Sequence, residues 1–299
     1  MAKVLSDTVI IIAGATASGK TELSHRLAKD LGGEIVSCDS RQIFKFMDIG
    51  TAKPPKSYRE EIPYHLIDIV NPDEPWTVAD FVREAGSRIS EIQGRGKVPF
   101  IVGGCGLYIK RLTSGLFLTP PPDMQLRERL AKKMGLYDEL IKIDPDAVKK
   151  ISEGDKKRII RALEVFYLTG KPISLLQKEE TPLPGFRFVM IALKTERDIL
   201  YQKINERVDR MIEEGWIEET KRLMEMGYGY NLRSMEGLGY RQIMDYLSGK
   251  IEQSLAISLI KQKTRQFAKR QLTWFADKNF TQASPSQVEN FLKQYFDET

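Results

Sequence analysis

The sequence predicts an α/β fold: a parallel sheet flanked by helices, with a small all-helical insertion. Buried apolar strands alternate with amphipathic helices, and a mainly helical stretch is bracketed by prolines. At 299 residues, the chain is long enough for one large domain that carries a smaller insert. Its 41% hydrophobic and 29% charged residues are typical of a globular protein and exclude a disordered one.

The first strand and helix are the clearest elements. Residues 8–14, TVIIIAG, form a β-branched apolar run that ends in glycine, which is typical of a strand buried on both faces. The helix that starts at Lys20 ends at the glycines 32–33, and its apolar positions share one face: Leu23, Leu27, Ala28 and Leu31. Residues 34–38 then read as a second strand, which completes a βαβ unit.

A second unit and a helical insertion follow. Apolar residues repeat at helical spacing from Val78 to Ile92 behind a cap at Thr77, and residues 98–102 read as a strand. Prolines at 120–122, 182 and 184 then bracket a helical pattern that contains Ile159, Leu163, Phe166 and Tyr167. A strand at 187–193 returns the chain to the sheet, and the sequence from Asp198 onward reads as helical. We therefore predict a core from 1–119, an insertion at 120–185, and a second core part with basic helices at 186–299.

Charge and cysteine content limit the possible partners. The net charge of +5 and pI near 9.0 permit a polyanionic partner. Cys38 and Cys105 lack zinc-type spacing and are interpreted as buried thiols. No run approaches the roughly 20 apolar residues of a membrane span, and no signal peptide is recognised, so we expect a cytoplasmic protein.

A phosphate-binding loop lies between the first strand and the first helix. Residues 14–21, GATASGKT, fit G-x-x-x-x-G-K-[ST] at every fixed position, which predicts a P-loop NTPase-like core. The Lys20 side chain adds a cation, and the Thr21 hydroxyl suits Mg²⁺. The predicted diphosphate-binding residues are Gly14, Ala15, Thr16, Ala17, Ser18, Gly19, Lys20 and Thr21. The motif indicates a polyphosphate without saying which one.

Further motifs carry a resemblance. The chain contains CDSRQIFKFMDIGTAKP from Cys38, PFIVGGCGLYIK from Pro99, GLGYRQIMDYL from Gly237 and TRQFAKRQLTWF from Thr264. Together these closely resemble the bacterial tRNA dimethylallyltransferase family, also called tRNA isopentenyltransferases, in the same order and over about Thr8 to Ala276. The resemblance implies transfer of a prenyl group from dimethylallyl diphosphate to N6 of adenosine 37 in tRNA.

The resemblance also implies roles for residues at the reacting groups. Asp39, in D-S-R-Q, matches the general base, which takes the proton as the carbon–nitrogen bond forms. Lys20, Thr21 with Mg²⁺, and the loop amides would hold the leaving diphosphate. Arg241 resembles a second cation on the phosphate side.

Contacts with the anticodon stem-loop are expected from three segments, in a monomeric enzyme. Beside Asp39, the resemblance implies contacts from Ser40, Arg41, Gln42 and Cys105, although the family usually has threonine at 105. In the insertion, the candidates are Arg127, Lys157, Arg158 and Arg161. Residues 261–270 hold five basic and no acidic residues, and a single helix face carries Lys261, Arg265 and Lys269. A solvated basic face is the alternative interpretation of this last segment.

Three other hypotheses remain open from the residues. An adenylate prenyltransferase would explain the loop and Asp39, but not the basic helix. A P-loop nucleotide kinase would use ATP and arginines of a lid, such as Arg127 and Arg158. A nucleotide-gated RNA-binding module would lack chemistry. His25 is interpreted as a surface residue, and Trp76, Trp216 and Trp274 as packing residues.

Overall fold

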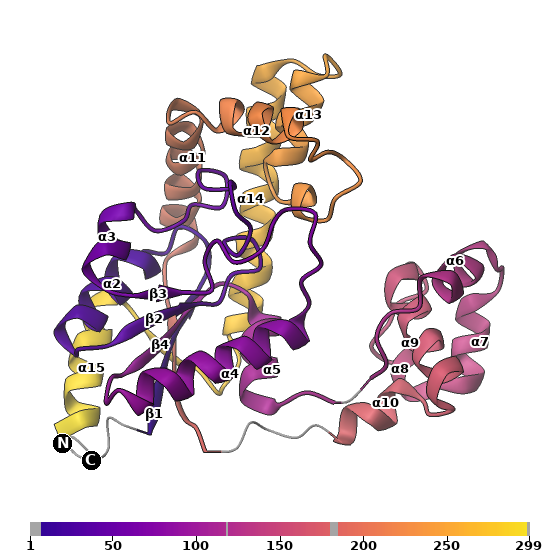
Figure 1. The fold of residues 1–299 in the computed structure, drawn as a ribbon, viewed down its shortest axis with the longest axis horizontal. Coiled ribbons are helices and arrows are strands. Elements are labelled where there is room, and N and C mark those ends of the chain that lie inside the picture. The colour runs from indigo at the N-terminus through magenta and orange to yellow at the C-terminus, as the bar shows by residue number, and fades with distance from the viewer. Residues whose placement is uncertain (1–6, 118, 180–184, 298–299) are drawn as a thin grey trace. The chain divides into compact units, whose positions relative to one another are not determined.

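The computed structural model describes residues 7–117, 119–179 and 185–297, which form two compact units (Figure 1). Unit 1 comprises Met1–Arg111 and Pro184–Thr299, and unit 2 comprises Leu112–Leu183. Unit 2 thus begins before the predicted residue 120, and Phe117 packs against its core. Pro182 and Pro184, which were predicted to mark the return to the core, lie outside the described residues.

Unit 1 is built on a parallel sheet with the strand order β3-β2-β4-β1-β5-β6. The strands are β1 (Thr8–Gly14), β2 (Glu34–Ser37), β3 (Tyr64–His65), β4 (Pro99–Gly103), β5 (Arg187–Leu193) and β6 (Thr281–Ala283). Every pairing between these strands is parallel, which confirms the predicted fold class. Strands β3 and β6 were not predicted, because two or three residues are too few to reveal a period of two.

Unit 1 also contains α-helices, several of which flank this sheet. They are α2 (Lys20–Asp30), α3 (Lys56–Glu61), α4 (Val78–Gly94), α5 (Gly106–Ser114), α11 (Arg197–Glu213), α12 (Trp216–Glu225), α13 (Tyr240–Leu247), α14 (Gln253–Phe275) and α15 (Pro285–Asp297). The predicted cap of α4 is confirmed, since Thr77 and Asp80 form a capping box. Within the described ranges, no helix has both the length and the apolarity to cross a membrane.

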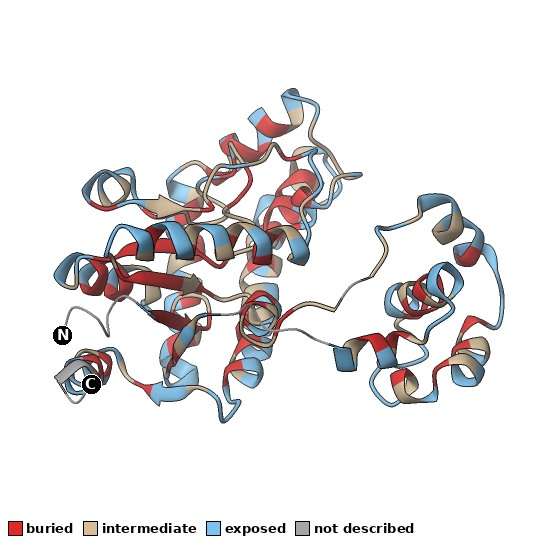
Figure 2. Cartoon of the chain, turned by 60° about the horizontal axis from the view of Figure 1, so that its bottom comes forward, coloured by how far each residue is buried: buried red, intermediate tan, exposed pale blue. Residues whose placement is uncertain are grey.

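The sheet is buried between its helices (Figure 2). Ile10 and Ile12 of β1 share a cluster with Leu23 of α2 and Val288 of α15. The alternating residue Ile11 is also fully buried and points to the opposite face. Burial on both faces explains why β1 is a continuous apolar run.

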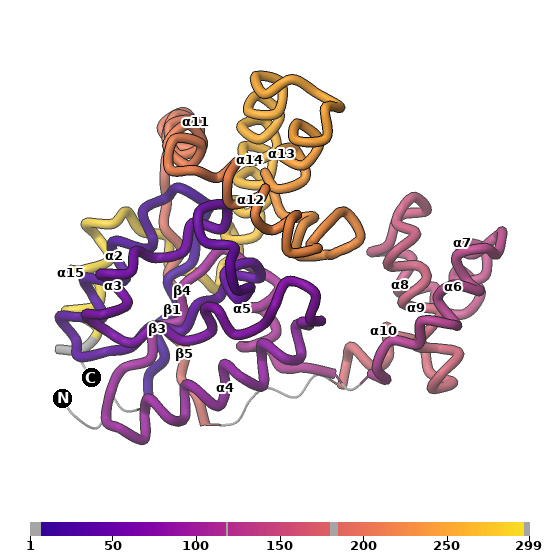
Figure 3. The backbone as a smooth tube through the Cα atoms, turned by 45° about the horizontal axis from the view of Figure 1, so that its top comes forward, coloured from indigo at the N-terminus to yellow at the C-terminus, as the bar shows by residue number. Residues whose placement is uncertain are grey.

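The helices α11 to α14 form a second core within unit 1, in which α11 lies beside α14 (Figure 3). Trp216, Tyr240 and Ile260 of this core pack against residues 43–47, which follow β2. The buried Glu219 carboxylate accepts hydrogen bonds from the backbone amides of Asp48 and Ile49 at 2.8 and 2.7 Å. The segment after β2 is therefore held by helices from the far end of the sequence.

Unit 2 is all-helical within its described residues. Its elements are α6 (Met124–Lys132), α7 (Leu136–Ile143), α8 (Pro145–Val148), α9 (Lys156–Thr169), α10 (Ile173–Leu176) and the 3₁₀ helix η1 (Gln177–Glu179). The other short 3₁₀ helix, η2 (Ser234–Glu236), belongs to unit 1. Ile159 and Leu163 are buried as the sequence predicts, whereas Tyr167 is exposed.

A buried carboxylate organises unit 2. Glu164 of α9 is fully buried and receives two hydrogen bonds of 2.8 Å from the Arg127 guanidinium and one of 2.5 Å from Arg161. Burial opposes its ionisation most strongly, but the arginine hydrogen bonds outweigh burial and lower the pKa of Glu164. This ion-pair cluster links α6 to α9.

We predict that Glu164→Gln loosens unit 2, because the substitution leaves two arginines without their shared anion. Breaking such a buried cluster costs roughly 3 kcal/mol. Hydrogen exchange of the α9 backbone amides in the full chain should therefore accelerate about 100-fold. Asp146→Asn is the matched control, since Asp146 pairs with Lys149 at the surface, and it should leave α9 protection unchanged. Equal protection in both variants would contradict the structural role of Glu164.

Candidate active site

The phosphate loop joins β1 to α2 in a tightly packed conformation. Ala17 and Gly19 have φ angles of 63° and 87°, so the backbone curls back on itself. The Lys20 Nζ atom donates to the Ala15 carbonyl at 2.6 Å. The Ser18 hydroxyl is buried and has no hydrogen-bond partner within the described chain. An unpartnered buried hydroxyl in such a loop is suited to a ligand oxygen.

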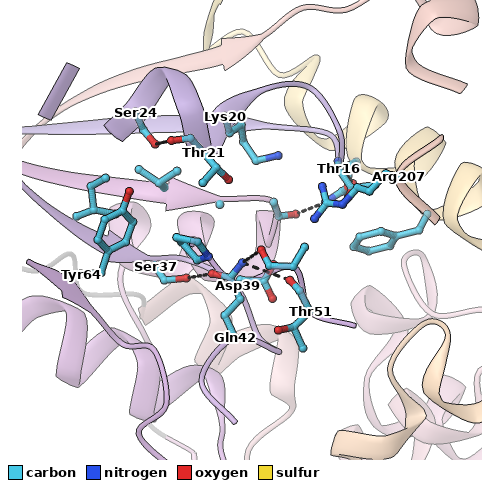
Figure 4. Close-up of a pocket in the computed structure, with 18 residues that line it drawn as sticks. Thr16, Lys20, Thr21, Ser24, Ser37, Asp39, Gln42, Thr51, Tyr64 and Arg207 are labelled. Carbon is cyan, nitrogen blue, oxygen red and sulfur yellow. Dashed lines mark hydrogen bonds between the residues drawn. The ribbon is translucent and has the colours of Figure 1, made fainter. Parts of the chain in front are cut away.

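A pocket opens beside this loop, and we call it the inner pocket (Figure 4). Figure 4 shows Lys20 and Thr21 on one side of it and Asp39 on the other. The β2 and β4 ends, the phosphate loop, α11 and α14 all contribute to its lining: Thr16, Lys20, Thr21, Ser24, Ile35, Ser37, Asp39, Gln42, Thr51, Ala52, Pro54, Tyr64, Val102, Gly103, Gly104, Arg207, Phe267 and Gln271. The pocket thus lies at the carboxyl ends of the strands, as in other open α/β sheets.

Two cations are crowded together in the inner pocket. Burial, assisted by the positive charge of Arg207, lowers the pKa of Lys20 to about 7, although the charge of Asp39 opposes this. Burial also lowers the pKa of Arg207. Two half-buried cations whose charges are both disfavoured by burial form a site prepared for an anion.

Arg207 was missed by the sequence analysis, and Arg241 lies elsewhere. Arg241 is exposed on α13, where its guanidinium lies 5.6 Å from the centre of the Tyr230 ring, and it does not line the inner pocket. Arg241 therefore does not lie beside the phosphate loop as expected, and the second cation that lines the pocket with Lys20 is Arg207. One signal could have identified it, because Arg207 is a charge between the apolar positions Ile204 and Met211 of α11.

Asp39 faces the cations from the end of β2. Its Oδ1 atom accepts a hydrogen bond of 2.8 Å from the Arg41 backbone amide, which fixes the carboxylate at the start of the next turn. The parallel register places β2 beside β4, and β4 beside β1 with its phosphate loop. A carboxylate and a phosphate site therefore share one pocket.

The residues after Asp39 differ in how far their side chains are engaged. The Gln42 side chain accepts from Ser37 at 2.9 Å and donates to the Thr51 and Ala52 carbonyls, so the protein itself uses its amide. The Arg41 guanidinium donates to the Arg233 carbonyl at 2.6 Å. Ser40 is half-buried. These contacts indicate that Gln42 shapes the pocket wall instead of presenting a free amide.

A larger hollow continues from Lys20, Thr21 and Arg207 along the outside of the loop, and we call it the outer hollow. Cations from α3 and α11 contribute to its lining, together with a few carboxylates: Lys53, Lys56, Arg59, Lys203, Arg210, Asp48, Glu22, Glu206 and Glu214. Lys53 is already occupied, since its ammonium group binds the Phe44 carbonyl and Asp48 at 2.7 Å. The phosphate loop is therefore accessible from the outer hollow as well as from the inner pocket.

The two cysteines are free thiols at the edge of the site. Cys38 is buried, and burial raises its pKa. Burial likewise raises the pKa of the half-buried Cys105 to about 11, so this thiol is neutral at physiological pH. The Cys105 amide donates to the Cys38 carbonyl at 3.4 Å, which holds the start of α5 next to Asp39.

The hard oxygen donors in the inner pocket fit a magnesium ion. Thr21 and Asp39 both line it, and Mg²⁺ is commonly held by one or two protein oxygens together with phosphate and water. Groups of three or more histidine, cysteine or acidic ligands do not occur among the described residues. The site therefore suits a metal brought in with a phosphate rather than one enclosed by the protein.

Some of the predicted RNA-contacting residues are bound to other side chains of the protein, and others are exposed. In unit 2, Arg127 and Arg161 are bound to Glu164, whereas Lys157 and Arg158 are exposed. On α14, Lys261 pairs with Asp209 at 2.7 Å, Arg265 donates to Asn205 at 2.7 Å, and Lys269 is exposed.

His25 is not the surface residue that the sequence suggested. It is 7% exposed, and its ring stacks on Tyr58 with centroids 3.9 Å apart. Its Nδ1 atom lies 3.1 Å from the Tyr64 hydroxyl. Since Tyr64 lines the inner pocket, His25 supports the pocket wall from behind.

Fold and site together define a phosphate-loop α/β protein in which an anion pocket faces a carboxylate. A sequence profile described as IPP transferase matches residues 42–278, and the chain belongs to this family. It is 49% identical to a tRNA dimethylallyltransferase of Carboxydothermus hydrogenoformans, over 91% of this chain and 89% of that protein. It is 46% identical to a tRNA dimethylallyltransferase of Geobacter sulfurreducens, over 89% and 88%.

Solved structures agree with this assignment. The fold is similar to that of a eukaryotic dimethylallyltransferase acting on tRNA, with a TM-score of 0.82 at 30% identity, over 93% of this chain and 74% of that one. A tRNA isopentenylpyrophosphate transferase of Bacillus halodurans gives a TM-score of 0.72 at 39% identity, over 98% and 97%.

We predict that Arg207→Gln weakens the binding of inorganic diphosphate about 10- to 100-fold, because the substitution removes a charge-assisted hydrogen-bond donor from a buried pocket. Isothermal titration calorimetry in the presence of Mg²⁺ measures this affinity. Arg241→Gln is the matched control, since it removes the same charge from an exposed position, and it should bind diphosphate like the unmodified protein. The opposite order of effects would show that Arg241 is the phosphate-side cation.

Proposed function

We propose that this protein transfers the dimethylallyl group from dimethylallyl diphosphate to N6 of adenosine 37 in the anticodon stem-loop of tRNA. The observation that carries the proposal is the pairing of Lys20 and Arg207 with Asp39 across one pocket. The family assignment and the names of the relatives support the same reaction. We expect the enzyme to act as a monomer in the cytoplasm.

The phosphate loop would bind the diphosphate group of the donor. The loop amides, the Ser18 hydroxyl, Lys20 and Arg207 would receive the charge that grows on the leaving oxygen. Their positions are set before the substrate arrives, so little reorganisation accompanies the reaction. When bound, Mg²⁺ neutralises part of the diphosphate charge, with the Thr21 hydroxyl as its protein ligand and Asp39 within the same pocket.

Asp39 serves the acceptor side. The N6 lone pair forms the new bond to C1 of the prenyl group as the bond from C1 to the diphosphate oxygen breaks. The N6 proton passes to the Asp39 carboxylate, and diphosphate leaves with the bonding electrons. The Arg41 amide, which occupies Oδ1, leaves Oδ2 to accept this proton.

The acceptor RNA would bind through exposed cations. Lys269 on α14 and Lys157 on unit 2 are exposed and available to phosphate, and Arg158 is exposed beside its surface partner Asp155 at 3.4 Å. Arg127 and Arg161 have a structural role instead, because Glu164 holds them. It also argues against Arg127 as an arginine of a kinase lid, because such an arginine must be free to reach a transferred phosphate.

The direct test of the proposal is mass spectrometry of an anticodon stem-loop RNA after incubation with the protein, Mg²⁺ and dimethylallyl diphosphate. We expect one added dimethylallyl group on adenosine 37. Prenylation of free AMP instead would identify an adenylate prenyltransferase, and ATP turnover would identify a kinase. Tight RNA binding without any product would leave only a binding module.

The role of Asp39 predicts a large loss of turnover on substitution. Asp39→Asn keeps an acceptor for the Arg41 amide but removes the base, so turnover should fall about 10²- to 10⁴-fold. Stem-loop affinity, measured by fluorescence anisotropy, should stay nearly the same. Turnover equal to that of the unmodified enzyme would reject the assignment of Asp39 as the base.

The basic face of α14 predicts a change in salt dependence. Replacing Lys261, Arg265 and Lys269 with glutamine should weaken stem-loop binding and flatten the plot of log affinity against log salt concentration by roughly 0.7 for each phosphate that is no longer neutralised. The control replaces three cations of α2 and α4, the exposed Lys29 and Arg83 and the half-buried Arg88. If both triple variants show the same slope, α14 is merely a solvated basic face.

A further inference from the structure

Trp274, near the end of α14, is an exposed aromatic residue next to the inner pocket. It is 45% exposed, whereas Trp216 is 2% exposed and belongs to the core of α11 to α14. Both were predicted to be packing residues, and Trp274 packs on one side only. An indole ring left half in water has a large apolar surface without a partner among the described residues.

One side of this ring packs against the backbone at Gly106. A Cβ atom on Gly106 would lie 2.7 to 2.9 Å from three ring atoms of Trp274, which is closer than packed atoms approach. The same helix also contacts Gly104, whose carbonyl accepts from the Gln271 amide at 2.9 Å. The lack of side chains at 104 and 106 therefore lets α14 hold the indole against the segment that follows β4.

The position of Trp274 on its helix connects it with the site. Phe267, Gln271 and Trp274 are spaced four and three residues apart, so they lie on one face of α14. Phe267 and Gln271 line the inner pocket, and Gln271 also accepts from the Thr16 amide of the phosphate loop at 2.8 Å. Trp274 continues this face beyond the pocket.

The charge around the ring favours a polyanion. Residues 261–276 contain basic residues and no acidic one, Asp277 is followed by Lys278, and Lys269 and Arg270 are exposed. A neutral apolar protein partner would remove water from these basic side chains without offering a counter-charge, which is unfavourable. RNA would instead pair them with phosphate. Unstacked bases of RNA loops are commonly bound by stacking on aromatic side chains.

We propose that the exposed face of the Trp274 ring is a stacking platform for a nucleobase next to the target adenosine of the RNA substrate. The inference rests on the proposed function, and it assigns to Trp274 the positioning of the loop while the target base enters the inner pocket. Stacking ignores base identity, so this platform would support many loop sequences.

The first experiment compares Trp274→Ala and Trp274→Phe in steady-state prenyl transfer to an anticodon stem-loop RNA. Loss of one stacked base should raise KM for the RNA about 5- to 100-fold in Trp274→Ala, with KM for dimethylallyl diphosphate unchanged. Trp274→Phe should recover most of the loss, because it restores an aromatic face. The matched control is Leu255→Ala, an equally exposed apolar residue about 28 Å away along the same helix.

A second experiment locates the stacked base. Stem-loop RNAs carry 2-aminopurine on the 5′ or the 3′ side of the target adenosine, and its fluorescence is measured on binding. At one of the two positions, quenching should be stronger with the unmodified protein than with Trp274→Ala. Gly106→Ala, which displaces the ring without removing it, should also reduce this quenching.

These readouts separate the possible failures. Suppose that the unmodified protein prenylates RNA, and that Trp274→Ala has the same KM and the same 2-aminopurine quenching. This result would overturn the stacking platform and leave the proposed function intact. An equal rise of both KM values would assign Trp274 to the fold of the pocket instead, which also rejects the inference. An unmodified protein that neither binds nor prenylates the stem-loop overturns both.

Discussion

The confinement of Lys20 and Arg207 in one buried pocket is the constraint on which unit 1 depends. Burial disfavours both charges and lowers the pKa of each, and the positive charge of Arg207 adds to the lowering of the Lys20 pKa. They remain together only because their elements cannot move apart: Ala15 of the phosphate loop packs against Leu200 and Ile204 of α11. Such a site gains most from an anion with several oxygens, which relieves the repulsion on binding.

The loop that precedes the pocket residues Thr51 and Ala52 depends on a second buried charge, Glu219. Its carboxylate receives the amides of residues 48–50 and the Tyr240 hydroxyl, so that no oxygen is left without a donor. A segment from the first 50 residues is thereby fixed by a helix some 170 residues later in the chain. Gln271 repeats this arrangement by joining the phosphate loop to Gly104. The pocket is thus assembled from both halves of unit 1, and a local change at α12 or α14 reaches it through hydrogen bonds.

Much of the fold could be predicted because the spacing of apolar residues in the sequence matches the burial of those residues in the structure. The continuous apolar run of β1, the helical spacing in α4 and the Thr77 cap each have one structural interpretation. The short strands β3 and β6 could not be predicted, since pairing to an existing sheet edge stabilises them rather than their own residues. The prolines indicated the insertion, but unit 2 starts at Leu112, before the first of them. The packing of Phe117 against the core of unit 2 could not be predicted from the local sequence.

The sequence by itself determined the phosphate loop, the position of Asp39 after a strand, and the family resemblance, because these depend on residues close together in the chain. Only the tertiary structure decided which distant side chains join them. It brought Arg207 to the pocket and left Arg241 outside, bound Arg127 and Arg161 to Glu164, buried His25 and exposed Trp274. The physical reason is that charge and aromaticity are properties of a residue type, whereas burial and partners are set by helices that pack from remote parts of the chain.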